Sequence, residues 1–221
     1  MRIGIIGPGH IGGNCAQQFL ASGKHEVMLS FSRHPERLAK LAGELGAEAS
    51  AGTPQDAVRF GDVIVLSVPW DAIPEALHQA GSLSGKIVID TTNQFGSRAL
   101  PAKGQTAAEF NAARMPGARY TKSFNTLTAG FQRQTASRPK DEKVVQWICG
   151  DDVEAKEIVA RLIEDAGYVP IDLGGTHECH VMEAPRRSGA VYGEEYRKPD
   201  AVAVLESVRH GKPIPPVPNY R

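Results

Sequence analysis

The stretch Gly7-Pro8-Gly9-His10-Ile11-Gly12 follows an apolar run, residues 3–6, and opens a segment with helical periodicity. Three glycines at this spacing, after a strand and before a helix, are typical of a dinucleotide-binding turn. Gly7 allows the tight turn, Gly9 lets the backbone approach a pyrophosphate, and Gly12 lets the helix pack closely on the strand. The pyrophosphate would accept from the free N–H groups at the helix N-terminus. We predict that all six residues line a dinucleotide, with His10 beside the phosphates; a glycine-rich turn without a ligand is the alternative.

Short β-branched runs alternate with helical segments over the first 90 residues. The expected strands are residues 3–6, 27–29, 63–66 and 87–89, and the expected helices are residues 11–22, 35–45, 54–60 and 70–80. Apolar strands that alternate with helices predict βαβ units and a parallel sheet covered on both faces. Because such crossovers are right-handed, we expect a doubly wound, mostly parallel α/β sheet of the Rossmann type.

The second half of the chain extends this pattern. We expect a helix at residues 106–113, a strand at 119–124, a polar loop or lid over 126–141, and a strand–helix–strand unit at 144–149, 153–166 and 168–171. This unit is predicted to continue the same sheet. Residues 1–173 would then form the dinucleotide-binding, Rossmann-type domain. Residues 174–221, with one amphipathic helix near 201–209, would form a C-terminal extension that serves as a substrate pocket or a dimerisation arm.

Length and composition limit the function classes. The chain has 221 residues, a formal net charge of zero and 41% hydrophobic residues, so one domain with an appendage and a real core are expected. Neutral charge gives no reason to expect nucleic acid or an anionic membrane as a partner. Three distant cysteines argue against a disulfide framework and for a reducing compartment. With no signal sequence and no stretch of roughly 20 apolar residues, we expect a cytoplasmic protein.

The end of the second expected strand distinguishes NADP from NAD. In an NAD site an acidic residue stands there and binds the ribose hydroxyls. Here Ser30, Ser32 and Arg33 occupy this end and no acid is present. A carboxylate would repel a 2′-phosphate, whereas Arg33 can bind it in a forked, charge-assisted way, with Ser30 and Ser32 donating. We therefore predict NADP(H) as the cofactor; a solvated turn arginine is the alternative.

Five motifs in this order resemble the coenzyme F-420-dependent NADP reductase family, whose core is shared by the reductase domains of the STEAP metalloreductases. They are residues 7–12, residues 30–33 with Pro35 following, Leu66-Ser67-Val68-Pro69-Trp70, residues 88–93 and Lys122-Ser123-Phe124-Asn125-Thr126. The resemblance covers residues 1 to about 130 and fits the later αβ unit. The tail from about Thr176 matches less clearly.

The resemblance implies a Rossmann-type domain, often a homodimer, that binds NADP(H) in an open groove. Ser67-Val68-Pro69 would run beneath the bridge between adenosine and nicotinamide, and Asn93 and Phe124-Asn125 would come near the nicotinamide. All three segments follow expected strands, and open α/β sheets bind ligands at the carboxyl ends of strands. An asparagine both donates and accepts, which suits a carboxamide. For each asparagine the alternative is a turn residue that bonds its own backbone.

The same resemblance implies hydride transfer between NADPH and a small-molecule acceptor such as coenzyme F-420, FMN or FAD. Transfer to a flavin-like ring depends mostly on how the two rings are positioned and needs no strong acid or base. This agrees with the sequence, in which no acid or base is clearly placed for catalysis, so the catalytic residue stays unassigned. A small-carbonyl reductase would need a proton donor, for which Lys122, Tyr120 and His10 are the candidates. A non-catalytic NADP(H)-binding redox sensor is a further alternative. The roughly 50 residues after the Rossmann part are too few for the helical domain of a β-hydroxyacid dehydrogenase.

Two polar clusters lie in the tail. The run Thr176-His177-Glu178-Cys179-His180, with Glu183 beyond it, gathers possible metal ligands. Metal sites commonly draw ligands from at least two segments, so we favour a polar loop at an interface or pocket rim and predict no metal site. Arg186-Arg187 could hold an anionic acceptor, with Tyr192 or Tyr196 stacking on its ring, but a solvated basic turn is the favoured interpretation.

Overall fold

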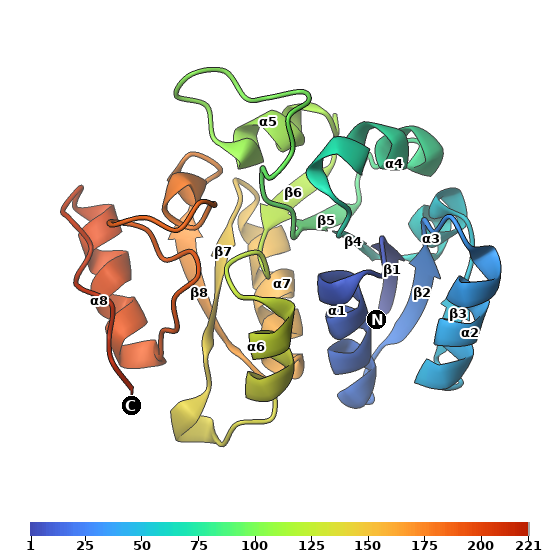
Figure 1. Cartoon of the computed structure of the whole chain (residues 1–221), viewed down its shortest axis with the longest axis horizontal. Coiled ribbons are helices and arrows are strands. Elements are labelled where there is room, and N and C mark those ends of the chain that lie inside the picture. The colour runs from blue at the N-terminus through green and yellow to red at the C-terminus, as the bar shows by residue number, and fades with distance from the viewer. Residues whose placement is uncertain (221) are drawn as a thin grey trace.

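Eight strands form one sheet in the order β3-β2-β1-β4-β5-β6-β7-β8 (Figure 1). The structure is a computed structural model that describes residues 1–220. The strands are β1 (Arg2–Ile6), β2 (Glu26–Ser30), β3 (Ala49–Ala51), β4 (Val63–Leu66), β5 (Ile87–Asp90), β6 (Arg119–Lys122), β7 (Val145–Cys149) and β8 (Val169–Gly174). The α-helices are α1 (His10–Ala21), α2 (Pro35–Leu45), α3 (Pro54–Phe60), α4 (Ile73–Ala80), α5 (Ala107–Ala113), α6 (Ala129–Thr135), α7 (Val153–Asp165) and α8 (Lys198–Arg209). Short 3-10 helices are η1 (Trp70–Ala72), η2 (Lys140–Glu142) and η3 (Glu178–Val181).

The sheet is parallel except at one junction. Neighbouring strands run parallel from β3 to β6 and again between β7 and β8. The two parts meet through a single antiparallel pair, Lys122 with Cys149. The strand order reverses between β1 and β4, and doubly wound sheets bind ligands outside the carboxyl ends of strands at such a switch point. The predicted doubly wound, mostly parallel α/β sheet is confirmed.

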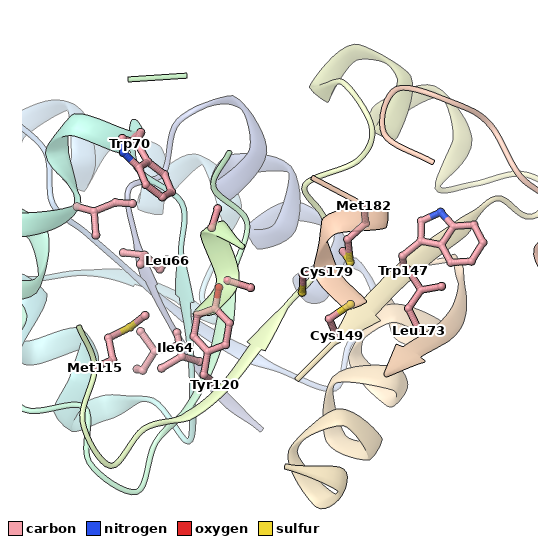
Figure 2. Close-up of a cluster of buried hydrophobic side chains, with 14 of the residues drawn as sticks. Ile64, Leu66, Trp70, Met115, Tyr120, Trp147, Cys149, Leu173, Cys179 and Met182 are labelled. Atoms are coloured by element: carbon pink, nitrogen blue, oxygen red, sulfur yellow. The ribbon is translucent and has the colours of Figure 1, made fainter. Parts of the chain in front are cut away.

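Alternate residues of the central strands pack into two apolar layers. Ile6, Ile64 and Leu66 belong to one cluster, whereas Ile5 and Val65 belong to the other. All five are fully buried, and burying such a side chain contributes about 1.5–3 kcal/mol. Figure 2 shows that the first cluster continues across the sheet to β7, β8 and η3. The C-terminal extension is therefore packed onto the same core as the N-terminal half.

Two elements differ from the sequence prediction. The predicted loop or lid over residues 126–141 was wrong in part, because helix α6 occupies Ala129–Thr135. Contacts from distant segments hold this helix: Tyr168 Oη donates to Gln132 O and Asn14 Nδ2 donates to Ala129 O, both at 2.8 Å. Strand β3 was missed because Ala-Ser-Ala contains no apolar run.

The extension after β8 is built around η3 and α8. Helix α8 begins at Lys198, a little before the predicted start, with Pro199 in its first turn, where a missing N–H costs nothing. Its buried residues Ala201 and Val204 join the first cluster. The division of the chain at residue 173 stays a prediction. Within residues 1–220 no helix is long and apolar enough to cross a bilayer.

Candidate functional site

The glycine loop between β1 and α1 leaves a helix N-terminus open to an anion. Gly7 has φ of 94°, and a Cβ on Gly12 would lie 2.2 Å from Gly7 O, so both positions require glycine. Gly9 is the N-cap of α1, no side chain caps that end, and the first turn carries no acid. A Cβ on Gly9 would meet nothing within 4 Å. The first-turn N–H groups and the space in front of them therefore fit a pyrophosphate.

The other residues of the loop are placed around this opening. Pro8 is partly buried, His10 is exposed at the first position of α1, and Ile11 packs against the second apolar cluster. These positions are compatible with a loop that lines phosphates. Contact between any of the six residues and a cofactor stays a prediction.

The end of β2 presents exposed cations. Ser32 accepts from His34 N at 3.1 Å, and Phe31 turns the chain with φ of 63°. Arg33 and Arg37 are exposed, and neither guanidinium has a partner within residues 1–220. Two unpaired arginines beside a hydroxyl suit a 2′-phosphate.

Ser30 lies differently from the prediction that it donates to this phosphate. Its side chain is fully buried and its hydroxyl donates to Ile5 O at 2.9 Å, which ties β2 to β1. This geometry leaves Ser32 and Arg33 as the predicted residues that face solvent at this edge.

The segment after β4 contacts the glycine loop. A Cβ on Gly7 would lie 2.5 Å from Ser67 O and 2.6 Å from Val68 Cγ1, so the two backbones touch. Thr91, which follows β5, donates its hydroxyl to Ser67 Oγ at 2.9 Å. Pro69 is exposed beyond them. The structure thus brings the glycine loop and the ends of β4 and β5 into one contiguous edge.

Asn93 and Asn125 meet each other beyond the ends of β5 and β6. Asn93 Nδ2 donates to Asn125 O at 2.8 Å, and Asn125 Nδ2 donates to Asn93 Oδ1 at 3.1 Å. Both also hold the extension: Asn125 Nδ2 donates to Met182 O at 2.8 Å, and Ala184 N donates to Asn93 Oδ1 at 3.3 Å. The buried Asn125 Oδ1 has no hydrogen-bond partner within residues 1–220. Sequence reasoning placed both amides at one site but missed their mutual contact.

The backbone of Phe124, and not its ring, lies at the edge formed by the strand ends. Its side chain is 1% exposed and packs edge-on against Phe19 and Tyr168 at 6.0 and 6.2 Å between centroids. The residue has φ of 59°, a conformation that few non-glycine residues adopt. This turn directs the chain from β6 towards Asn125.

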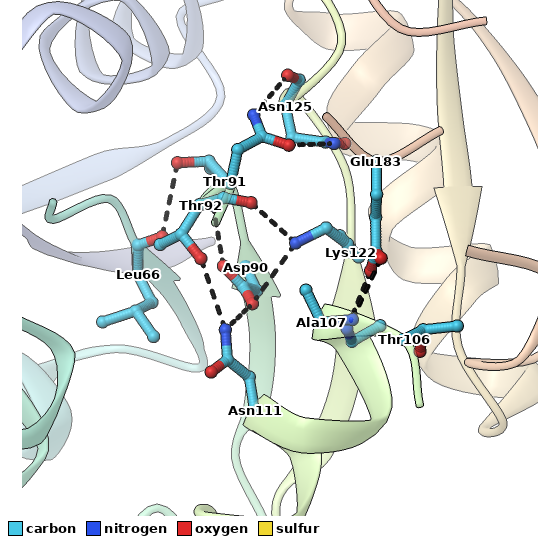
Figure 3. A network of polar contacts seen from close by, with 12 residues as sticks. Leu66, Asp90, Thr91, Thr92, Thr106, Ala107, Asn111, Lys122, Asn125 and Glu183 are labelled. Carbon is cyan, nitrogen blue, oxygen red and sulfur yellow. Dashed lines mark hydrogen bonds and ion pairs between the residues drawn. The ribbon is translucent and has the colours of Figure 1, made fainter. Parts of the chain in front are cut away.

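A buried polar network lies beneath the asparagines (Figure 3). Asp90 Oδ2 accepts from Tyr120 Oη at 2.6 Å and from Asn111 Nδ2 at 2.8 Å, and it lies 3.6 Å from Lys122 Nζ. Asp90 Oδ1 accepts from Thr92 N at 2.7 Å, while Lys122 Nζ donates to Thr92 O at 2.7 Å. Both main-chain polar groups of Thr92 are therefore fixed, immediately before Asn93.

The network also sequesters three titratable side chains, those of Asp90, Lys122 and Tyr120. Asp90, Lys122 and Asn111 are fully buried and Tyr120 is 6% exposed. Burial, followed by the charge of Asp90, raises the pKa of Tyr120 well above its ordinary value. Sequence reasoning had named Tyr120 and Lys122, but missed Asp90, whose only local signal is an acid at the end of an apolar strand.

A second buried carboxylate joins the extension to α5. Glu183 accepts from Ala107 N at 2.9 Å and from Ala108 N at 2.8 Å, so it caps the helix with a charge that the helix N-terminus favours. Thr106 Oγ1 donates to Thr176 O at 2.9 Å in the same contact. Residues 176–184 are therefore fastened to both the α5 region and the asparagine pair.

The possible metal ligands of the tail do not converge. His177 and His180 are exposed with ring centroids 6.0 Å apart, whereas Cys179 is fully buried and Glu178 accepts from Gly175 N. Figure 2 shows Cys179 beside Cys149 in the core. Among residues 1–220 no group of three or more histidine, cysteine or acidic side chains is arranged to hold a metal ion.

The basic turn is engaged within the protein. Arg186 pairs with Glu194, and Arg187 donates to the carbonyl oxygens of Glu183 and His180. Tyr196, one of the two predicted stacking residues, is 1% exposed, which leaves only Tyr192 of the pair near the surface.

Residues 2–94 match the family described as NADP oxidoreductase, coenzyme F-420-dependent. The chain is 30% identical over 183 residues to the metalloreductase STEAP3 of Rattus norvegicus, a match that covers 83% of this chain and 36% of that protein. The chain thus spans about a third of the length of that relative. It is 27% identical over 200 residues to the F-420-dependent NADP reductase of Methanothermobacter thermautotrophicus, with 83% of this chain and 85% of that protein covered.

The fold is also found in a solved structure. A hypothetical protein, SMa0349, from Sinorhizobium meliloti has a TM-score of 0.78 and 29% identity, with 90% of this chain and 96% of that chain covered. The match therefore includes at least part of the C-terminal extension as well as the Rossmann core. The predicted resemblance to the coenzyme F-420-dependent NADP oxidoreductase family is confirmed over the Rossmann core.

Proposed function

We propose that the protein transfers a hydride between NADPH and a flavin or deazaflavin acceptor. The observation that carries this proposal is the burial of Lys122 and Tyr120, two of the three candidate proton donors; the third, His10, lies exposed at the start of α1, where we propose that the phosphates bind. Lys122 is fully buried against Thr92 O and Asp90, and Tyr120 donates to Asp90. A carbonyl substrate needs a proton from a group that can reach it. A flavin-like ring does not need such a group, so positioning is sufficient.

Bound NADPH would supply the hydride, and the chain would supply its position. The first turn of α1 would hold the pyrophosphate, and Ser32 and Arg33 the 2′-phosphate. Residues 67–69 would support the bridge between the two nucleosides. The backbone around Asn93 and Asn125 would set the height of the nicotinamide, because Asp90 and Lys122 fix Thr92 from below.

The relatives support the same class of reaction. One is named an F-420-dependent NADP reductase and another a metalloreductase, and this chain covers only 36% of the latter. We therefore choose the deazaflavin or flavin acceptor over a metal chelate for this chain. A cytoplasmic homodimer belongs to the same proposal, and sedimentation of the purified protein tests the dimer.

Anaerobic stopped-flow absorbance at 340 nm tests the proposal. NADPH is mixed with the protein and coenzyme F-420, FMN, FAD, a ferric chelate or a small aldehyde. We expect NADPH oxidation with at least one flavin or deazaflavin and none with the aldehyde. Tight NADP(H) binding without oxidation by any acceptor would support the redox-sensor alternative instead. Oxidation by the aldehyde that depends on Lys122 would support the carbonyl reductase.

A further inference from the structure

Two aromatic rings stand at the outer rim of the asparagine pair. Phe95, in the loop between β5 and α5, exposes 71% of its surface. Its ring lies 6.2 Å from the ring of Tyr192 between centroids, with 61° between their planes. We name Phe95 and Tyr192 the aromatic corner. A lone exposed apolar residue needs no explanation, but Phe95 is exposed against the half-buried ring of Tyr192 from a distant segment, and such a pair does need one.

Both rings are attached to the site by main-chain hydrogen bonds. Phe95 N donates to Asn93 O at 2.8 Å, and Gly193 N, next to Tyr192, donates to Thr126 O at 2.8 Å. Asn93 follows β5 and Thr126 follows Asn125, so the aromatic corner continues directly from the edge proposed for the nicotinamide.

The loop that carries Phe95 is fixed at a second point. Ser97 N and Arg98 N both donate to the carboxylate of Asp71, at 3.4 and 3.0 Å, and Trp70 Nε1 donates to Arg98 O at 3.0 Å. The exposed ring is therefore presented by a restrained loop. Restraint before binding reduces the entropy that a ligand contact must overcome.

The exposed groups of this corner suit a flat, conjugated and anionic molecule. The exposed Phe95 ring is inclined at 61° to the half-buried Tyr192 ring, and stacking of a ligand on an aromatic ring contributes about 0.5–1.5 kcal/mol beyond burial. Burial raises the pKa of Tyr192, so its phenol stays neutral, and its hydroxyl has no hydrogen-bond partner within residues 1–220. The Arg98 side chain is exposed and also without a partner in the described chain.

We propose that the aromatic corner is the acceptor subsite, where Phe95 and Tyr192 stack against the planar ring system of a flavin or deazaflavin. Arg98 lies on the same loop and supplies positive charge for the phosphate of such a molecule. The inference rests on the proposed function for the identity of the acceptor. It commits to a ring-bearing small molecule; a second copy of the chain, which would also cover Phe95, is an outcome of the test.

Ligand binding tests the subsite without relying on turnover. The probes are FMN and coenzyme F-420, each titrated by fluorescence into the full chain saturated with NADP+. We expect saturable quenching of at least one probe by the wild type. Phe95→Ala and Phe95→Leu should each weaken binding about 5–10-fold, because leucine keeps the apolar bulk but not the ring. Phe95→Tyr should restore binding, and Tyr192→Ala should weaken it.

Leu100→Ala is the matched control, because Leu100 is 51% exposed on the same loop and outside the aromatic corner. Its affinity for the probes and the NADP+ affinity of every variant should stay at the wild-type value. Failure of both probes to bind the wild type, or equal losses in Phe95→Ala and Leu100→Ala, would overturn the subsite. A change of mass from dimer to monomer in Phe95→Ala would assign the corner to a contact between copies. Probe binding without NADPH oxidation would contradict the proposed function and leave the subsite intact.

Discussion

Replacing Arg33 by aspartate should weaken NADPH binding by about 2.5 kcal/mol. Arg33 is exposed and has no partner within residues 1–220, so its loss removes about 1.5 kcal/mol of charge-assisted hydrogen bonding to the 2′-phosphate and leaves no other group unpaired. A carboxylate about 4 Å from the phosphate adds roughly 1 kcal/mol of repulsion in water. At 1.4 kcal/mol for each factor of ten, the sum corresponds to about a 60-fold rise in Kd.

The assay is titration of NADPH fluorescence at low and high salt, with NADH measured in parallel. NADH affinity should not change, and the difference for NADPH should shrink as salt screens the exposed charges. Lys40→Asp is the control, because it changes the charge equally on an exposed position of α2. Unchanged NADPH affinity in Arg33→Asp, or the same loss in Lys40→Asp, would refute the assignment of the phosphate site.

Three further sets of substitutions test the glycine loop, the buried network and an ion pair. Gly9→Ala should keep the thermal stability but weaken NADPH binding. Gly12→Ala, whose Cβ would lie 2.2 Å from a backbone oxygen, should lower the unfolding free energy by at least about 2 kcal/mol. Similar effects of the two changes on the unfolding free energy would contradict this expectation. Lys122→Met should lower the free energy of unfolding, measured in urea, by about 3–5 kcal/mol, because the buried carboxylate of Asp90 loses its cation. Adding Asp90→Asn to the same chain should recover much of that loss. The hydrogen bond from Arg119 lowers the pKa of Asp152 from 3.8 to about 2. The ionised Asp152 therefore stabilises the folded protein above about pH 4, and this stabilisation is lost as the pH falls towards 2. The stability difference between wild type and Asp152→Asn should shrink over that range, and a constant difference would exclude this linkage.

The sheet could be predicted from the sequence because its signals are local. Buried parallel strands appear in the sequence as apolar runs, and the glycine spacing predicts the tight turn from β1 into α1. Helix α6 could not be predicted, because Gln132 is fixed by Tyr168, which lies 36 residues away, just before β8. A seven-residue helix with a glycine at its second position is unstable without such contacts.

The sequence predicted which residues lie at the candidate site, but not which hydrogen bonds their side chains make. Sequence order places residues at strand ends, yet the direction of a hydroxyl or amide depends on the neighbouring strand. Ser30 faces Ile5 because β2 pairs with β1 in a register that aligns Ser30 with Ile6. Asn93 meets Asn125 because β5 and β6 run in register up to Asp90 and Lys122. Such registers follow from packing of the whole sheet.

The anchors between the extension and the asparagine pair have a consequence for protein engineering. They use main-chain atoms, the carbonyl of Met182 and the N–H of Ala184, so they place few demands on side-chain identity there. Glu183 alone is committed through its side chain, as the cap of α5. Residues 185–196 carry Tyr192, and they also contribute Val191 and Tyr196 to the first apolar cluster. We expect that exchanging the other residues of this segment, with Val191 and Tyr196 kept, alters acceptor preference while the nucleotide half keeps its geometry.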